Sequence, residues 1–98
     1  MKILAIDEFL PGVTLEQVGP YLKEEAAHAW DLYMKGTFRE VYFRGDHPGA
    51  VLILECEDLR EAEAVLASLP LVKANLIKFD LIPLKAFRPF ELLFAEEE

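Results

Sequence analysis

The sequence predicts an α+β domain in which two helices cover one face of a single antiparallel sheet. Two observations support this prediction. The predicted elements follow one another along the 98-residue chain in the order strand, helix, strand, strand, helix, strand. The composition, 53% hydrophobic and 29% charged, is typical of one folded domain and too apolar for an intrinsically disordered chain.

The first strand and the first helix are predicted at the N-terminal end. A short apolar run predicts a strand over residues 2–6, which the acidic pair Asp7-Glu8 ends. Thr14 and Gln17 have the spacing of a capping box, so a helix is predicted to begin after Thr14. Pro20 predicts either a kink in this helix or a later start. Its apolar residues recur at helical spacing: Leu15, Val18, Leu22, Ala26, Ala29 and Tyr33.

A β-hairpin is predicted in the middle of the chain. Residues 37–44 are rich in β-branched and aromatic side chains, and residues 50–55 form an apolar run; both patterns are typical of strands. The segment between them, residues 45–49, contains two glycines and a proline, which favour a turn. The two strands are therefore expected to pair with each other.

The second helix and the last strand complete the predicted sandwich. Asp58 is the expected helix cap, Glu61 completes a second capping box, and Pro70 ends the helix. A final strand is predicted over residues 76–84. The order βαββαβ is that of a ferredoxin-like sandwich, which we assign to residues 1–86. The expected buried stripe of the second helix is Leu59, Ala62, Leu66 and Leu69.

The face of the sheet away from the helices is predicted to be too apolar to face water. Residues 3–6 and 51–54 are apolar at every position, so both faces of each predicted strand are apolar. A sheet with one face in water instead alternates apolar and polar residues. A tail of residues 87–98 follows the last strand. We therefore expect a homodimer or a larger homo-oligomer, with the tail packed on a neighbouring subunit. The apolar side chains of this tail are Phe87, Phe90, Leu92, Leu93 and Phe94.

Charge and cysteine content argue against several partners and locations. Ten Lys and Arg against eighteen Asp and Glu give a net charge of −8, which repels phosphate backbones, so no nucleic-acid partner is expected. The single cysteine, Cys56, cannot form an intrachain disulfide. No apolar run approaches the ~20 residues of a membrane span, and acidic residues interrupt the N-terminal run where a signal peptide would need its apolar core. These features favour a cytoplasmic protein that does not associate with membranes.

Glu25 is the first candidate for chemistry. On a helical wheel it lies at the edge of the apolar stripe, while Glu24 points nearly the opposite way. Partial burial raises the pKa of a carboxyl group, which suits a general acid or base that works near neutral pH. Spacing alone leaves open a purely structural alternative, in which Glu25 points to solvent or pairs with a basic residue on the sheet.

Arg39 is the second candidate. Strict alternation along the strand places Arg39 on the same face as Val41 and Phe43, opposite Phe38. A guanidinium among apolar neighbours binds an anion, either the carboxylate of Glu25 or that of a ligand. The alternative is an edge position from which the long side chain reaches water.

The remaining candidates are a histidine and three aromatic residues. His47 lies in the predicted hairpin turn, where a histidine is either solvated or functional. Trp30, Tyr33 and Tyr42 either line a ligand pocket or belong to the core. No metal site is expected, because the histidines lack nearby ligands at metal-binding spacing.

The stretch from Glu24 to Asp80 resembles muconolactone isomerase, a member of the dimeric α+β barrel superfamily. The matching pieces are Gly36-Thr37-Phe38-Arg39, the turn residue His47, and Leu69-Pro70-Leu71, which fall at the same mutual spacings. Two positions depart from the family pattern: Tyr42 stands in place of a tryptophan, and Glu40 in place of a histidine. The first strand and the tail do not match well.

The resemblance implies a cofactor-free isomerase of aromatic-acid catabolism. Such an enzyme moves a proton on a small unsaturated lactone that carries a carboxylate. The resemblance places the acidic catalytic residue at Glu25, the carboxylate-binding residue at Arg39, and His47 at the mouth of the pocket. The expected partner is thus a small acidic ligand.

Two other functions stay open from the sequence. A non-catalytic ligand-binding or assembly module of the same fold predicts a filled interior and a Glu25–Arg39 ion pair with no cavity beside it. A cofactor-free oxygenase or a YciI-like enzyme keeps the pocket and changes the chemistry. Whether the chain is an enzyme is left open by the residues alone.

Overall fold

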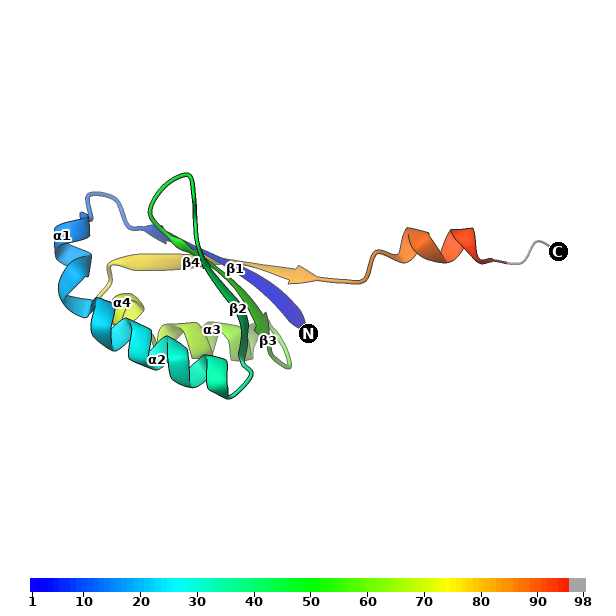
Figure 1. Ribbon diagram of the computed structural model, residues 1–98, viewed down its shortest axis with the longest axis horizontal. Coiled ribbons are helices and arrows are strands. Elements are labelled where there is room, and N and C mark those ends of the chain that lie inside the picture. Colours follow the sequence, from blue (N-terminus) through cyan, green and yellow to red (C-terminus); the bar gives the residue numbers. More distant parts are fainter. Residues whose placement is uncertain (96–98) are drawn as a thin grey trace.

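The computed structural model describes residues 1–95 and confirms the predicted α+β, ferredoxin-like arrangement (Figure 1). Four antiparallel strands form one sheet in the order β2-β3-β1-β4. The strands are β1 (Lys2–Phe9), β2 (Phe38–Phe43), β3 (Ala50–Glu55) and β4 (Ile77–Leu84). The α-helices lie on one face of the sheet and are α1 (Leu15–Val18), α2 (Leu22–Met34), α3 (Leu59–Ala67) and α4 (Pro70–Lys73). Two 3₁₀ turns are η1 (Gly19–Tyr21) and η2 (Arg88–Leu93).

The helix-covered face of the sheet carries the main core. Alternation along β1 directs Ile3 and Ala5 toward the helices, and the strand register places Leu54 and Leu52 opposite them on the same face. Side chains from β2, α3 and the segment after β3 complete this cluster. Its buried members are Ile3, Ala5, Phe38, Leu52, Leu54, Cys56, Ala62, Leu66 and Leu69.

Strand β1 extends beyond its predicted end. We expected the acidic pair to end the strand after Ile6, but pairing with β4 continues through Asp7 to Phe9. The reason is a tertiary contact, because the carboxylate of Asp7 accepts the backbone amide of Ala50 at 2.8 Å. A carboxylate with a backbone donor is tolerated on a buried strand position, and this one is on the core face.

The first predicted helix is broken in two. Thr14 and Gln17 form the predicted capping box, but Pro20 lies in the 3₁₀ turn η1 that separates α1 from α2. The apolar residues that recur along the predicted helix are mostly not buried: Val18 is buried, whereas Leu15, Leu22 and Tyr33 are exposed. Helix α2 has no buried residue, because a cavity described below separates it from part of the sheet.

A bulge in β2 overturns the predicted faces of this strand. Phe38 pairs with Leu54 and Val41 pairs with Leu52, so Phe38 and Val41 lie on the same, helix-covered face. The register shifts between Phe38 and Glu40, and Arg39 is the extra residue. Strict alternation fails here because the bulge adds one residue to one strand only.

The second half of the chain follows the prediction closely, except that Leu59 of the expected buried stripe is exposed. Strand β3 has the predicted bounds, and Asp58 caps α3 by accepting the amide of Glu61 at 2.8 Å. The Glu61 carboxylate, however, accepts the amide of Glu57, not that of the cap residue. Pro70 does not simply end the helix: α3 stops at Ala67, and Pro70 begins the short helix α4.

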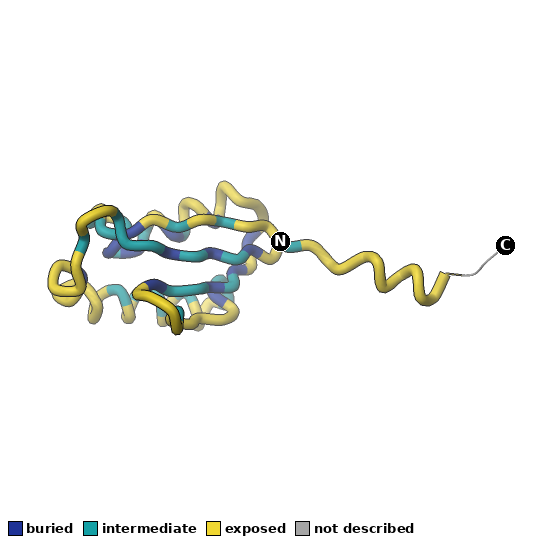
Figure 2. Tube along the Cα trace, turned by 90° about the horizontal axis from the view of Figure 1, so that it is seen from above, coloured by how far each residue is buried: buried dark blue, intermediate teal, exposed yellow. Residues whose placement is uncertain are grey.

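The uncovered face of the sheet carries partly exposed apolar groups, and the tail carries largely exposed ones. The register places Leu4, Ile6, Val51 and Ile53 together on the uncovered face. The tail runs away from the domain, so the molecule is 63 Å long but only 28 by 20 Å across (Figures 1 and 2). Its Phe94 is 82% exposed. Packing of the tail on a neighbouring subunit stays a prediction, and its residues 96–98 lie outside the described part.

Within residues 1–95, no helix combines the length and the hydropathy needed to cross a membrane.

Candidate functional site

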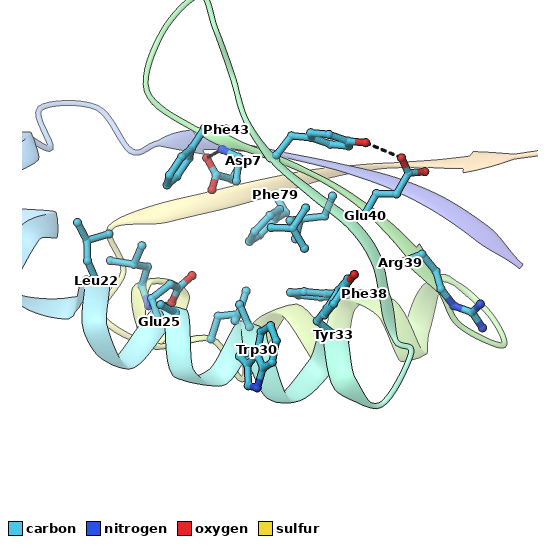
Figure 3. Close-up of a pocket in the computed structure, with 18 residues that line it drawn as sticks. Asp7, Leu22, Glu25, Trp30, Tyr33, Phe38, Arg39, Glu40, Phe43 and Phe79 are labelled. Atoms are coloured by element: carbon cyan, nitrogen blue, oxygen red, sulfur yellow. Dashed lines mark hydrogen bonds between the residues drawn. The ribbon is translucent and has the colours of Figure 1, made fainter.

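A cavity of about 700 Å³ lies between helix α2 and the helix-covered face of the sheet (Figure 3). Its walls are mostly apolar and include aromatic side chains from strands β2 and β4 and from helix α2. Such a cavity, with a few polar groups on an apolar lining, is the usual form of a small-molecule site. Its apolar lining includes Leu22, Ala26, Ala29, Phe38, Val41, Phe43, Leu52, Leu71 and Phe79.

Glu25 lies on the α2 wall of this cavity. Its Oε1 atom accepts the backbone amide of Leu71 at 3.0 Å, an amide in the first turn of α4 that has no partner within its own helix. Burial raises the pKa of the Glu25 carboxyl above its usual value of 4.5, while the Leu71 amide opposes this shift. Glu25 thus combines a fixed position with a proton affinity above that of an exposed glutamate.

Asp7 lies on the sheet wall of the same cavity and was missed as a site residue in the sequence. It is 7% exposed, and burial raises the pKa of its carboxyl above the usual value of 3.8. The amide of Ala50 and the positive charge of Arg44 oppose this shift. The negative charge of Asp7 in turn raises the pKa of Glu25, which shows that the two carboxylates interact.

A signal for Asp7 was present in the sequence. It follows Ile3 and Ala5 at alternate positions, so the pattern that buries these two residues also directs Asp7 inward. An acidic residue on the core face of a strand is rare unless it has a partner or a function. Ending the strand at Ile6 hid this position.

A second, smaller cavity of about 340 Å³ adjoins the first one beneath the β2–β3 hairpin. It holds His47, which the resemblance placed at the mouth of the pocket. The side chain of His47 is half exposed, and its Nε2 atom lies 3.8 Å from the carboxylate of Asp46. The two cavities share four lining residues: Asp7, Leu22, Phe43 and Leu71.

The structure does not bring Arg39 to Glu25. The Nε atom of Arg39 donates a hydrogen bond to the carbonyl of Gly36 at 2.6 Å, and the side chain is exposed. Figure 3 shows its guanidinium directed outward at the opposite end of the cavity from Glu25. The β2 bulge is the cause, because it removes Arg39 from the regular alternation of the strand.

The aromatic candidates occupy the border of the cavity. Trp30 and Tyr33 lie beside each other on α2, with ring centroids 5.8 Å apart, and both are largely exposed. Tyr42 borders the cavity too, but its register with Val51 assigns its side chain to the uncovered face. There its hydroxyl donates to the carboxylate of Glu40 at 2.7 Å, which raises the pKa of Tyr42 (Figure 3). Tyr42 is thus engaged away from the two carboxylates.

The arrangement can bind a small apolar ring and move protons on it. Two carboxyl groups with raised pKa values lie on opposite walls of an apolar cavity, which is the setting for general acid–base chemistry.

Neither a protein-family model nor a curated protein matches the chain at a significant level. Among solved structures, the chain is similar to 5-chloro-2-hydroxyhydroquinone dehydrochlorinase from Burkholderia phenoliruptrix, whose structure is a complex with 2,5-dihydroxybenzoquinone. The two chains share 21% sequence identity with a TM-score of 0.64, over 91% of this chain and 98% of the other. At this identity the likeness concerns the fold, and the fold it supports is the ferredoxin-like α+β domain.

Proposed function

We propose that this protein is an enzyme that transfers a proton on a small unsaturated cyclic compound, without a cofactor. The observation that carries the proposal is the carboxyl group of Glu25, held by the Leu71 amide on the wall of an apolar cavity of about 700 Å³. A base in such a position removes a proton from a carbon next to a carbonyl group, and burial favours the transfer because it raises the pKa of Glu25.

Two features favour an enzyme over an assembly module with a filled interior. That alternative requires a Glu25–Arg39 ion pair with no cavity beside it. Instead, the cavity is present, and Arg39 is bound to the carbonyl of Gly36. The solved structural relative is named as a dehydrochlorinase and is bound to a quinone, which supports a small ring as the ligand.

The specific reaction we propose first is isomerisation of an unsaturated lactone, as the resemblance to muconolactone isomerase implies. In this reaction the proton that Glu25 removes returns to another carbon of the same molecule. Dehydrochlorination of a chlorinated ring is the second candidate, because the structural relative carries that name. In that case Glu25 would take the proton while chloride leaves with the bonding electron pair.

The test measures proton transfer directly. A panel of unsaturated lactones, with and without a carboxylate, is incubated with the protein in D₂O, and loss of C–H signals is followed by proton NMR. We expect wild type to accelerate exchange for at least one compound, and Glu25→Gln to lose about 100-fold or more of that rate. The side-chain carbonyl oxygen of glutamine can still accept the Leu71 hydrogen bond, so we expect the fold to be preserved.

The matched control is Glu24→Gln. Glu24 precedes Glu25 on α2 and is exposed to solvent, so its loss changes the net charge equally without altering the cavity. Exchange by Glu24→Gln should equal that of wild type. Full activity in Glu25→Gln, or no accelerated exchange with any member of the panel, would overturn the proposed function.

We also propose that the uncovered sheet face and the tail associate with a second copy of the chain. The tail carries five apolar side chains that are 62–82% exposed. Isolated apolar patches of this kind are costly in water and mark interaction surfaces. Light scattering after gel filtration should give at least a dimer, and Leu92→Ser with Leu93→Ser should shift it toward the monomer. A monomeric wild type would contradict the proposed assembly.

A further inference from the structure

Asp7 and Glu25 are held in the same way on opposite walls of the cavity. Asp7 Oδ1 accepts the amide of Ala50 at 2.8 Å, and Glu25 Oε1 accepts the amide of Leu71 at 3.0 Å. Among residues 1–95, no donor is bound to the second oxygen of either carboxylate. Each side chain is therefore fixed by one oxygen and presents the other to a molecule in the cavity (Figure 3).

The basic side chains near this pair already have partners. Arg44 donates two hydrogen bonds to the carboxylate of Asp46, at 3.0 and 2.9 Å. His28, one turn after Glu25 on α2, is hydrogen-bonded to the hydroxyl of Ser68 at 2.7 Å. Arg39 is bound at the opposite end of the cavity. Within the described residues, the polar wall of the cavity beside Asp7 and Glu25 is therefore acidic.

We infer that Asp7 and Glu25 form a two-carboxylate catalytic pair whose substrate is an uncharged ring that carries hydroxyl or carbonyl groups. The inference rests on the proposed function, to which it adds the second proton-transfer group and the class of substrate. A ligand carboxylate placed between two acidic side chains would be repelled by them, and the two arginines near the cavity, Arg39 and Arg44, are already hydrogen-bonded to Gly36 and Asp46. This differs from the acidic ligand that the resemblance implies.

The pair completes the proton transfer without an oxidant or a reductant. Glu25 removes a proton from a ring carbon next to a carbonyl, and the C–H electron pair becomes a C=C bond. The carbonyl oxygen gains the π electrons and takes a proton from the free oxygen of protonated Asp7. In the return step, Asp7 recovers that proton and Glu25 delivers its own to another carbon of the conjugated system. Both carboxyl groups end as they began.

The surroundings of the two groups raise the proton affinity of both. Burial raises the pKa of both carboxyls, and the charge of Asp7 raises that of Glu25 further. Two interacting carboxylates in an apolar site do not ionise independently, because the charge of one disfavours ionisation of the other. One member is then available as an acid while the other acts as a base.

The catalytic half of the inference is tested with resorcinol, an uncharged ring whose C–H groups exchange through its keto form. Ring exchange in D₂O is followed by proton NMR for wild type, Asp7→Asn, Glu25→Gln and the double variant. We expect each single variant to lose about 100-fold, and the double variant to lose little more than either one, because the two groups act as a unit.

The control for Asp7→Asn is Glu8→Gln. Glu8 is the next residue of β1 and lies on the opposite face of the sheet, so this variant should exchange at the wild-type rate. Far-ultraviolet circular dichroism verifies that both variants fold. Should Asp7→Asn fail to fold, the pH profile of wild type decides: a pair requires that the rate falls on both sides of an optimum, and a fall on one side only contradicts it.

Failure of this inference is distinguishable from failure of the proposed function. Loss of exchange in Glu25→Gln, with full exchange in Asp7→Asn, would remove Asp7 from the chemistry and leave the proposed function intact. Wild-type exchange in Glu25→Gln would overturn both. Exchange of a carboxylated lactone but not of resorcinol would overturn the substrate class alone.

The substrate class is also tested by binding. Calorimetry at neutral pH compares resorcinol with resorcylate, the same ring with one added carboxylate. We expect resorcinol to bind wild type at least tenfold more tightly, and this preference to shrink in Glu25→Gln because the charged member of the pair is gone. Tighter binding of resorcylate by wild type would contradict the inference.

Discussion

Two aspartates lie near the same hairpin, and their surroundings affect them in opposite ways. Asp7 is buried on the sheet wall of the cavity, and burial raises the pKa of its carboxyl. Asp46 is exposed in the turn after β2, where two hydrogen bonds from Arg44 hold the pKa of its carboxyl well below its usual range.

The comparison shows how one guanidinium gives two nearby carboxyl groups different pKa values. Arg44 lowers the pKa of both aspartates, but it forms its hydrogen bonds with Asp46 alone. Asp7 receives a backbone amide and a weaker charge interaction, which do not outweigh its loss of solvation. The carboxylate without a bound cation is thus the one suited to proton transfer, while the paired one shapes the loop.

Among the variants that test this comparison, Gly49→Ala is expected to have the largest effect. A Cβ atom at Gly49 would lie 2.8 Å from both the carbonyl oxygen and Oδ1 of Asp7, and the φ angle of 150° is unfavourable for other residues. We expect a loss of about 1–3 kcal/mol in the free energy of unfolding, measured by chemical denaturation. Activity should fall as well, because Asp7 is displaced.

Gly45→Ala is the control within the same turn. A Cβ atom there meets no heavy atom within 4 Å, so unfolding should change by no more than about 0.5 kcal/mol. Equal losses of unfolding free energy in the two variants would show that Gly49 is needed for the conformation of the turn, and not for its close approach to Asp7.

The next effect is the pH dependence of stability, compared between wild type and Asp7→Asn. Because folding raises the pKa of Asp7 above 3.8, the folded state binds more protons than the unfolded state between the usual and the raised value. Stability from this group is therefore present at low pH and lost as the pH rises through that window.

Asparagine carries no charge, so Asp7→Asn should be more stable than wild type above this window and similar to it below. The neighbouring groups that share in the titration are Glu25 and Arg44, both retained in the variant. Thermal unfolding at a series of pH values measures the difference. A variant that is less stable than wild type at neutral pH would mean that the Asp7 carboxylate is stabilising when ionised.

The smallest effect is expected from Asp46→Asn. The lowered pKa of Asp46 means that its contribution is present above 3.8 and lost as the pH falls. Because the pair is exposed, solvent and salt screen it, so the stability loss should be slight at low salt and absent at high salt. A large, salt-independent loss would show that Asp46 acts through the shape of the hairpin instead.

The sequence predicted most elements because their signals are local. Strand β3 and the caps at Thr14 and Asp58 follow from patterns within a few residues. Strand β1 was cut short at Ile6 because its extension depends on Ala50, 43 residues away from Asp7 in the sequence. Local polarity suggested an end where a distant amide allows the strand to continue.

The candidate site was likewise predictable only where its signal is local. The helical wheel singled out Glu25, and the structure places it in the cavity wall. Arg39 was expected beside it, but the bulge between Phe38 and Glu40 turns this side chain outward. A bulge depends on how two strands pair, and a periodicity of two along one strand carries no signal for it.

By itself, the sequence determined the order of elements, the ferredoxin-like class and the apolar character of both sheet faces. These depend on hydrophobic periodicity and turn residues, which act over a few neighbouring positions. Only the tertiary structure decided that Asp7 faces Glu25 across a cavity and that Arg44 is bound to Asp46. Proton affinity depends on burial and on the nearest charges, and both arise only when distant segments of the chain come together.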